Sequence, residues 1–275
     1  MQSDNIITYK FQDWIPISKI DLIGLSLNPN AIHILEKNLE KVNWYNLSLN
    51  PNAIHLLEEN LDKVVWENLS SNPNAVHILE KNFDKINWSK LSENPNAIQL
   101  LEKNPTKICW RSLSKNPSAL HLLENNFNKM NWYSLAENSN AIHLLERNKS
   151  LINWSWLSLN PNPNAIKLLE SHQDYINWDH LSFNPNAICL LEKNLDKVDW
   201  EHLSLNPNAI DILKKNQDNI DWVNMSSNPS IFEKTINYKF LKNRMDVIRE
   251  ELLMKCMHPA RLHRWLEMGG DIDDF

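Results

Sequence analysis

The chain has 275 residues and a net charge of −6; 42% of its residues are hydrophobic and 23% are charged. This composition is that of a globular protein, and it excludes a chain that is disordered throughout. The acidic balance argues against sequence-independent binding to nucleic acid, which needs clustered lysine and arginine. The three cysteines, Cys109, Cys189 and Cys256, are far apart and form no CxxC pair, which favours a reducing compartment and no zinc site.

The first residues of the chain and its hydropathy indicate where the protein acts. The first residues, MQSDNIITYKFQDW, lack a basic end followed by an apolar run, so we expect no signal peptide. There is no stretch of about 18 apolar residues, which predicts that no segment spans a membrane. Both observations favour a cytoplasmic protein that is not secreted.

A 22-residue repeat fills most of the chain and is found by aligning the tryptophans. Each unit reads W-x-x-L-S-x-N-P-N-A-I-x-L-L-E-K-N-x-D-K-I-N, and Leu22 holds the place of the first tryptophan. One step is 24 residues long because LSLNPNPNAIKLLE carries an extra Asn-Pro within residues 160–163. Such repeats indicate a solenoid, in which every unit buries its apolar face against its neighbours. The tryptophans are Trp44, Trp66, Trp88, Trp110, Trp132, Trp154, Trp178, Trp200 and Trp222.

Each unit predicts a helix of about ten residues and a short second helix. Asn50 is placed to cap the longer helix, with the following proline at its first position, where a missing N–H does no harm. Asn60 is expected to end it, because asparagine tolerates the left-handed conformation that otherwise calls for glycine. The short helix begins at the tryptophan. An Asn or Asp before it, such as Asn87, provides a cap in most units, and Val65 and Cys109 depart from this pattern.

The predicted fold class is all-α, an α-solenoid of about ten 22-residue helix–turn–short-helix repeats. It divides into an N-terminal cap (1–21), the tandem repeats (22–235), and a helical C-terminal cap with an acidic tail (236–275). Units stacked ~8–10 Å apart would form a rod or shallow superhelix roughly 80–100 Å long. Strands are disfavoured because period-two alternation is absent and proline recurs in every unit.

The tryptophan ladder has two interpretations. We expect all nine ladder tryptophans to be structural core, since each unit supplies one large residue beside Leu and Ile. The alternative is a platform on which bases stack. Trp156 lies off the ladder and next to the inserted Asn-Pro, where we expect a bend or bulge.

Positions that vary among the units are the candidate binding surface, because the constant positions serve packing and capping. The two residues after each tryptophan vary most, and so does the residue before Asn-Pro, for example Leu49, Lys115 and Phe183. The alternative is a free surface that simply drifts. The candidate partner-binding residues in the repeats are Tyr45, Glu67, Lys90, Arg111, Tyr133, His180 and His202.

A ladder of histidines raises the question of a metal site. Its rungs should be ~10 Å apart, too far for neighbours to share a zinc ion comfortably, and Gln99 and Lys167 interrupt the series. We therefore predict no metal and interpret the ladder as a solvated helix face near recurrent glutamates such as Glu58. The ladder consists of His33, His55, His77, His121 and His143.

Two helices are expected after the repeats, separated by a His-Pro pair and ended by Gly269-Gly270. The second carries a basic and aromatic cluster that could bind phosphate or an acidic partner. The alternative is a cap whose basic face pairs with local acids. The cluster comprises His258, Arg261, His263, Arg264 and Trp265, of which His258, Arg261 and Arg264 are candidate partner-binding residues.

The repeat words resemble a tandem-repeat family of giant DNA viruses, with NPNAIHLLEKN-type units of 22 residues. FQDWIPISKID and EELLMKCMHPARLHRWLEMGGDIDDF resemble the opening and closing segments of that family. The resemblance implies a viral protein that acts in the infected host cell or is packaged in the virion. It carries over no activity, cofactor or catalytic residue. The Asn-Pro insertion, NPSAL at Asn116 and NSNAI at Asn138 depart from the pattern.

The expected function is a non-enzymatic scaffold that mediates protein–protein interaction with a host or viral protein. The alternatives are a virion structural component and a module that reads single-stranded RNA one base per repeat. We expect no enzyme and no cofactor, because GxGxxG, GxxxxGK[ST], HExxH and GxSxG are all missing. Cys109 and Cys189 fall at repeat positions that hold Asn and His elsewhere, so no catalytic role is assigned to them.

Overall fold

A computed structural model describes residues 7–256 and 258–269 and confirms the all-α repeat solenoid. Residues 11–232 form one compact unit, and the described residues outside this range belong to a second unit. Within the first, each repeat has a helix that begins at the tryptophan, here the Trp helix. In all repeats but the last, a second helix follows the Asn-Pro pair, here the Asn-Pro helix.

Both kinds of helix are short. The Trp helices are α1 (Leu22–Leu27), α3 (Trp44–Leu49), α5 (Trp66–Ser71), α7 (Trp88–Glu93), α9 (Trp110–Leu113), α11 (Trp132–Leu135), α13 (Trp154–Leu157), α15 (Trp178–Phe183), α17 (Trp200–Leu205) and α19 (Trp222–Ser227). The Asn-Pro helices are α2 (Ile32–Leu35), α4 (Ile54–Glu58), α6 (Val76–Lys81), α8 (Ile98–Glu102), α10 (Leu120–Asn125), α12 (Ile142–Arg147), α14 (Pro163–Glu170), α16 (Ile188–Glu192) and α18 (Ile210–Lys215). Helices of this length are unstable alone and depend on their neighbours.

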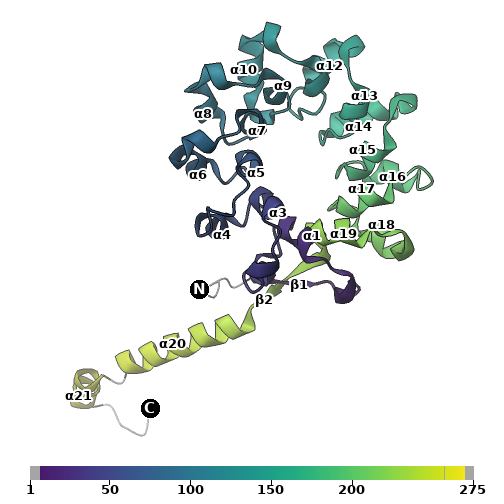
Figure 1. Ribbon diagram of the computed structural model, residues 1–275. Helices are drawn as coiled ribbons and strands as arrows, with labels where there is room; N and C mark the ends of the chain where they lie inside the picture. The colour runs from purple at the N-terminus through teal and green to yellow at the C-terminus, as the bar shows by residue number, and fades with distance from the viewer. Residues whose placement is uncertain (1–6, 257, 270–275) are drawn as a thin grey trace. The chain divides into compact units, whose positions relative to one another are not determined.

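The solenoid closes on itself, so the expectation of an open rod or shallow superhelix is wrong. The first Trp helix, α1, packs against the last, α19, and Figure 1 shows α1 to α19 following one another around a closed ring. The backbone N–H of Asp21 donates to Ser226 Oγ (2.9 Å). The side-chain amide of Asn28 donates to the carbonyl oxygens of Ser226 (3.0 Å) and Asn228 (2.8 Å). Bonds of the same kind join the other neighbouring repeats, so the closure continues the repeat pattern.

A ladder of buried asparagines joins every repeat to the one before it. Asn94, for example, donates from Nδ2 to the carbonyl oxygens of Ser70 (3.1 Å) and Asn72 (2.9 Å), and its Oδ1 accepts from the N–H of Asn96 (3.0 Å). Its amide is therefore paired on both sides, as a buried polar group must be. The ladder comprises Asn28, Asn50, Asn72, Asn94, Asn116, Asn138, Asn160, Asn184, Asn206 and Asn228.

Because the buried asparagine bonds to the preceding repeat, the helix that follows it is shorter than predicted. In most repeats the Asn-Pro-Asn segment forms a turn, and the helix starts only after the alanine, as α8 does at Ile98. The inserted Asn-Pro changes this in one repeat. There Asn162 accepts from the N–H of Asn164 (2.9 Å), Pro163 takes the first helical position, and α14 is eight residues long. Only this repeat approaches the longer helix that the sequence predicts for all of them.

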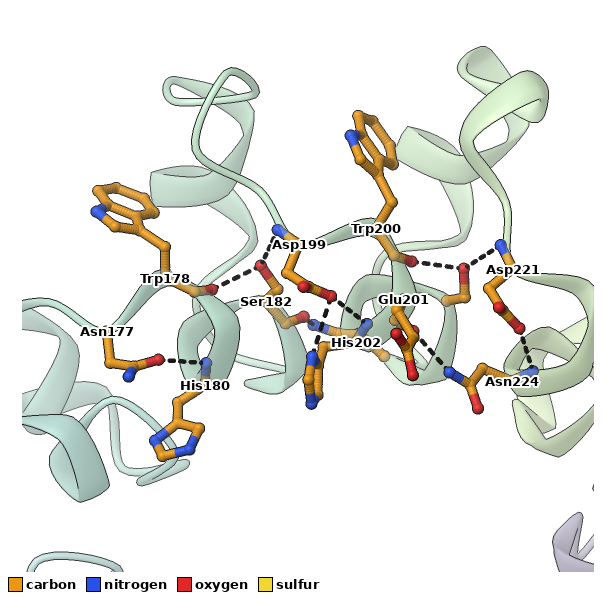
Figure 2. Close-up of polar contacts among 12 residues, drawn as sticks. Asn177, Trp178, His180, Ser182, Asp199, Trp200, Glu201, His202, Asp221 and Asn224 are labelled. Atoms are coloured by element: carbon orange, nitrogen blue, oxygen red, sulfur yellow. Dashed lines mark hydrogen bonds and ion pairs between the residues drawn. The ribbon is translucent and has the colours of Figure 1, made fainter.

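A ladder of buried serines runs beside the asparagines. Ser92 donates to the carbonyl oxygen of Trp88 (2.7 Å) and accepts from the N–H of Cys109 in the next repeat (3.0 Å). Figure 2 shows the same pair of bonds at Ser182, which links Trp178 to Asp199. In one repeat Ala136 replaces the serine and supplies no hydroxyl.

The caps at the start of the Trp helices agree with the sequence prediction, whereas those at the end of the Asn-Pro helices do not. Asn87 caps its Trp helix by accepting an N–H three residues on (3.0 Å), and Val65 and Cys109 make no side-chain cap, as expected. The asparagine after an Asn-Pro helix is not left-handed. Asn82 has φ −127° and ψ 52°, and no described residue other than glycine has a positive φ. Its amide instead donates to the carbonyl oxygen of Ile78 (2.8 Å), which satisfies the helix end.

Leucine and alanine fill the core between the two layers of helices. Leu91, Ala97 and Leu101 are completely buried, and their equivalents in the other repeats are nearly all the same. The ladder tryptophans border this core, because each of them is only half-buried. They are Trp44, Trp66, Trp88, Trp110, Trp132, Trp154, Trp178, Trp200 and Trp222. The sequence predicts that tryptophan fills the core, whereas leucine, alanine, serine and asparagine are the buried residues.

The terminal parts of the chain contribute two strands and two helices. Strand β1 (Ile7–Phe11) pairs with β2 (Phe232–Ile236), which replaces the Asn-Pro helix of the degraded last repeat. At the closure Phe11 stacks on Phe232 with ring centroids 4.5 Å apart. The two expected C-terminal helices are present as α20 (Tyr238–Cys256) and α21 (Pro259–Glu267). The acidic tail lies outside the described residues.

Gly24 permits the close approach of α1 to α19. A Cβ at this position would lie 2.6 Å from the carbonyl oxygen of Val223 and 2.7 Å from Cβ of Ser226, closer than such atoms can come. The other repeats carry a larger residue here, for example Asn46 in the second repeat. The closing contact is therefore tighter than the others and excludes a side chain.

We expect Asn94→Ala to lower the free energy of unfolding by about 3 kcal/mol or more, because it leaves two buried carbonyl groups and one N–H without their partner. Asn96→Ala is the matched control, because the Asn96 amide makes one exposed bond to Pro73 (2.9 Å), and we expect it to cost under ~1 kcal/mol. Urea denaturation measures both. Equal costs would contradict the ladder.

We expect Gly24→Ala to strain or open the closure at a cost of about 1–3 kcal/mol, the usual effect of overpacking. The melting temperature should fall and the radius of gyration from small-angle X-ray scattering should rise. Asn46→Ala, at the same place in the second repeat, should leave the radius unchanged. A Gly24→Ala protein with unaltered radius and melting temperature would show that α1 and α19 do not meet as described.

Candidate partner-binding face

The Trp helix has a constant side and a variable side. With 3.6 residues per turn, residues one, two and five places after the tryptophan lie about 100°, 200° and 140° around the helix from it. The Leu and Ser three and four places after it lie on the other side and are buried. We call the surface made by residues one, two and five places after each tryptophan, or after Leu22, the variable face. Figure 2 shows His180 and His202 on the far side of their helices from Trp178 and Trp200.

The variable face is turned toward the interior of the ring. Figure 1 shows α3, α5, α7 and α17 nearer the centre of the ring than α4, α6, α8 and α18. The Asn-Pro helices thus cover the outer side of the Trp helices. The side of a Trp helix that is not covered by this layer is the one that carries the variable residues.

All the candidate residues from the repeats lie on this face, in different surroundings. Tyr45 and Tyr133 are 59% and 51% exposed. Glu67 and Arg111 are exposed as well, whereas the other three are half-buried: Lys90, His180 and His202. The structure therefore places these residues on the same face, although they come from seven different repeats.

The other three candidates belong to the second unit. His258 caps α21 by accepting the N–H of Ala260 (3.3 Å), and the guanidinium of Arg261 donates to the carbonyl oxygen of Lys255 (3.3 Å). Arg264 is exposed on the same helix. Two of the three side chains thus make local contacts at the junction of α20 and α21, and nothing assigns them to the ring.

Amide side chains two places after the tryptophan fix the order of residues along part of the face. Each donates to the carbonyl oxygen of the residue one place after the tryptophan in the preceding repeat. The bonds are Asn46 to Ile23 (2.9 Å), Asn68 to Tyr45 (2.8 Å) and Asn224 to Glu201 (3.3 Å), the last of which is drawn in Figure 2.

Trp156 occupies a different part of the face and is surrounded by its own neighbours. The ammonium of Lys115 lies 4.9 Å from its ring centroid, and the rings of His180 and Tyr133 lie at 5.1 and 6.1 Å. Glu137 holds the same ammonium at 2.9 Å. This cluster joins residues one, two and five places after the tryptophan from four repeats, and internal contacts satisfy much of it.

Five of the ladder tryptophans have another side chain over the face of the ring. Lysines lie over several of them, three of these lysines coming from the end of the same repeat, and Tyr175 and His172 stack on Trp154 at 5.3 and 4.7 Å. A base could stack there only after displacing these side chains, which weakens the interpretation as a stacking platform. The lysine pairs are Lys63 over Trp44, Lys129 over Trp110, Lys197 over Trp178 and Lys19 over Trp222.

Side chains of the histidine ladder contact glutamates between neighbouring Asn-Pro helices. Four of its histidines reach the glutamate of the preceding repeat, and both partners are substantially exposed, so each pair adds little stability. Among the described residues no group of three His, Cys, Asp or Glu side chains is placed to hold a metal ion. The pairs are His55–Glu36 and His77–Glu58 (both 2.9 Å), His121–Glu102 (3.1 Å) and His143–Glu124 (3.7 Å).

Asp199 carries the clearest electrostatic effect on the Trp helices. Its partial burial opposes ionisation, but hydrogen bonds from the backbone N–H (2.8 Å) and the ring Nδ1 (3.0 Å) of His202 outweigh burial and hold the pKa of Asp199 below its ordinary value. Figure 2 shows both bonds. A depressed pKa in the folded state stabilises the protein above the unfolded pKa of ~3.9, and this stability is lost as pH falls through the folded value.

We expect His202→Ala to raise the pKa of Asp199 by removing the ring contact while the backbone bond remains. Carbon-13 NMR titration of the side-chain carboxyl measures the change. His180→Ala, two places after the preceding tryptophan, should leave this pKa unaltered. A titration of Asp199 that is the same with and without the His202 ring would contradict the assigned cause.

Sequence reasoning missed two residues of this face, Ile23 and Val223. They stand one place after Leu22 and Trp222, in the first and last repeats, and only the closure makes them neighbours. A signal was present, because they are aliphatic where the other repeats carry Tyr, Glu, Ser, Arg or Asp. Without knowledge of the closure, the two aliphatic residues could not be recognised as neighbours.

Comparisons with protein-family models, with curated proteins and with solved structures found no match. Over the part of the chain that the structure describes, no helix combines the length and apolar character needed to cross a bilayer.

Proposed function

We propose that the ring is a non-enzymatic scaffold that binds another protein through its variable face. The observation that carries the proposal is that the constant and the variable residues of each repeat have different roles. The constant residues form the ladders and the core. Several variable residues are large, apolar and exposed without holding the ring together: Tyr45 (59%), Val223 (59%), Tyr133 (51%) and Phe183 (42%). Exposed aromatic side chains on one continuous surface are typical of protein-binding sites.

The chemistry of the face favours protein over RNA. Its acids include Glu67, Asp179 and Glu201, all exposed, and carboxylates repel phosphate. The covered indole rings also offer few surfaces for bases. Reading of single-stranded RNA therefore remains only as an outcome of the test.

The proposed biological context of the interaction rests on the sequence of the repeats alone. Their resemblance to the giant-virus family supports a viral protein whose partner is a host or viral protein in an infected cell or in a virion. A structural role in the virion is one form of the same proposal, in which the bound partner is a particle component.

The test is capture of the tagged protein with its partners from infected-cell lysate, with and without nuclease, read by mass spectrometry. We expect a defined protein set that survives nuclease and falls by about tenfold with Tyr45→Ser/Tyr133→Ser. Leu61→Ser/Leu195→Ser is the matched control, since both leucines are 39% exposed but precede the tryptophan and lie off the variable face.

Two results would contradict the proposal. Recovery that collapses on nuclease treatment would assign the face to nucleic acid. Equal loss of partners with the tyrosine pair and the leucine pair would show that the variable face is not the binding surface.

A further inference from the structure

We propose that the part of the variable face created by ring closure binds a protein segment in which apolar side chains are flanked by lysine or arginine. The proposal deepens the scaffold function and rests on it. The closure sector, as we call it, is the row of residues one place after the tryptophan in five consecutive repeats. In spatial order they are Glu201, Val223, Ile23, Tyr45 and Glu67.

Backbone contacts set this order across the closure. Asn224 and Asn46 hold the carbonyl oxygens of Glu201 and Ile23, at 3.3 and 2.9 Å. Between the last and first repeats, Gly24 takes the place of the amide, and Ser227 donates to its carbonyl oxygen (3.0 Å). The row is thus continuous although the chain enters and leaves the ring inside it.

The middle of the sector is apolar and exposed. Val223, Ile23 and Tyr45 are 59%, 52% and 59% exposed, in three neighbouring repeats. Leu27 and Leu49, four places after Ile23 and Tyr45 on the same helices, are half-buried on the same face. Single exposed apolar residues need no explanation, but a run of them on neighbouring helices marks an interaction surface.

The two ends of the sector carry uncompensated negative charge. Glu67 and Glu201 are exposed, and neither makes an ion pair with any residue that the structure describes. Glu137 and Glu58, by contrast, have partners, Lys115 (2.9 Å) and His77 (2.9 Å). Two unpaired carboxylates on either side of an apolar run complement basic groups on either side of apolar ones.

The same charges exclude other occupants. A second copy of the chain bound through this sector by two-fold symmetry would bring the same unpaired acids together, which is unfavourable. A nucleic acid would bring phosphates to the same carboxylates. A basic and apolar protein segment is the occupant that satisfies both the apolar centre and the acidic ends.

The probe is a fluorescent peptide of three leucines flanked by lysines, tested on the full chain by fluorescence anisotropy. Two control peptides carry glutamate in place of lysine, or the same residues with lysines interspersed among the leucines. We expect the lysine-flanked peptide to bind at least about tenfold more tightly than either. Tyr45→Ser should weaken it about tenfold, whereas Tyr133→Ser, at the same place in a repeat outside the sector, should change it less than about twofold.

A charge reversal completes the test. Glu67→Lys/Glu201→Lys should reverse the preference toward the glutamate-flanked peptide. The proposal is overturned if no peptide binds, if the peptides bind equally, or if Tyr133→Ser weakens binding as much as Tyr45→Ser. Self-association in sedimentation that Tyr45→Ser abolishes would assign the sector to a second copy. Should the peptides fail while the tyrosine pair still releases captured partners, the scaffold stands and only this sector assignment falls.

Discussion

The buried asparagine that follows each Trp helix is the group on which the rest of the structure depends. Its Nδ2 offers two hydrogens and its Oδ1 accepts, and the neighbouring repeat and the turn supply two carbonyl groups and one N–H to match. Helices of four to six residues have little stability of their own. The leucine core holds the two layers together, and the asparagine and serine ladders fix each repeat to the next in one register.

The ladder also gives a physical reason for the closed ring. In an open array the first asparagine amide would lack the preceding repeat, and the last repeat would present carbonyl groups with no following amide. Leaving such groups without partners at a packed end is costly. Closure removes both ends at once, because Asn28 donates to Ser226 and Asn228 as its equivalents donate elsewhere. Gly24 makes room for this contact, because a side chain at that position would clash with α19.

Much of the local structure follows from the sequence because it depends on contacts within one repeat. The start of each Trp helix, its Asn or Asp cap, the exceptions at Val65 and Cys109 and the two C-terminal helices were all predicted. What could not be predicted depends on contacts between repeats. The turn at Asn-Pro-Asn exists because the asparagine bonds to its neighbour, and the ring exists because the rotation between repeats sums to a full circle. Neither the turn nor the ring can be predicted from the sequence of a single repeat.

The same distinction applies to the candidate site. Variation among the repeats identified the face, including Tyr45 and Glu67, because solvent-facing positions are free to differ. It did not identify Val223 and Ile23, whose meaning comes from a contact between residues about 200 positions apart. The tryptophans were expected in the core because they are large and recur, whereas each indole is half-buried at the border of the core, several of them beneath a lysine or an aromatic ring.

Closure of the ring is the central claim, and the distance between the second and last repeats tests it directly. Spin labels at Tyr45→Cys and Val223→Cys, with the three native cysteines changed to serine, can be measured by double electron–electron resonance. Two repeat steps across the closure predict a narrow distribution at about 20 Å or less. An open solenoid would place eight repeat steps between the labels, and a distribution centred near ~70 Å would contradict the ring.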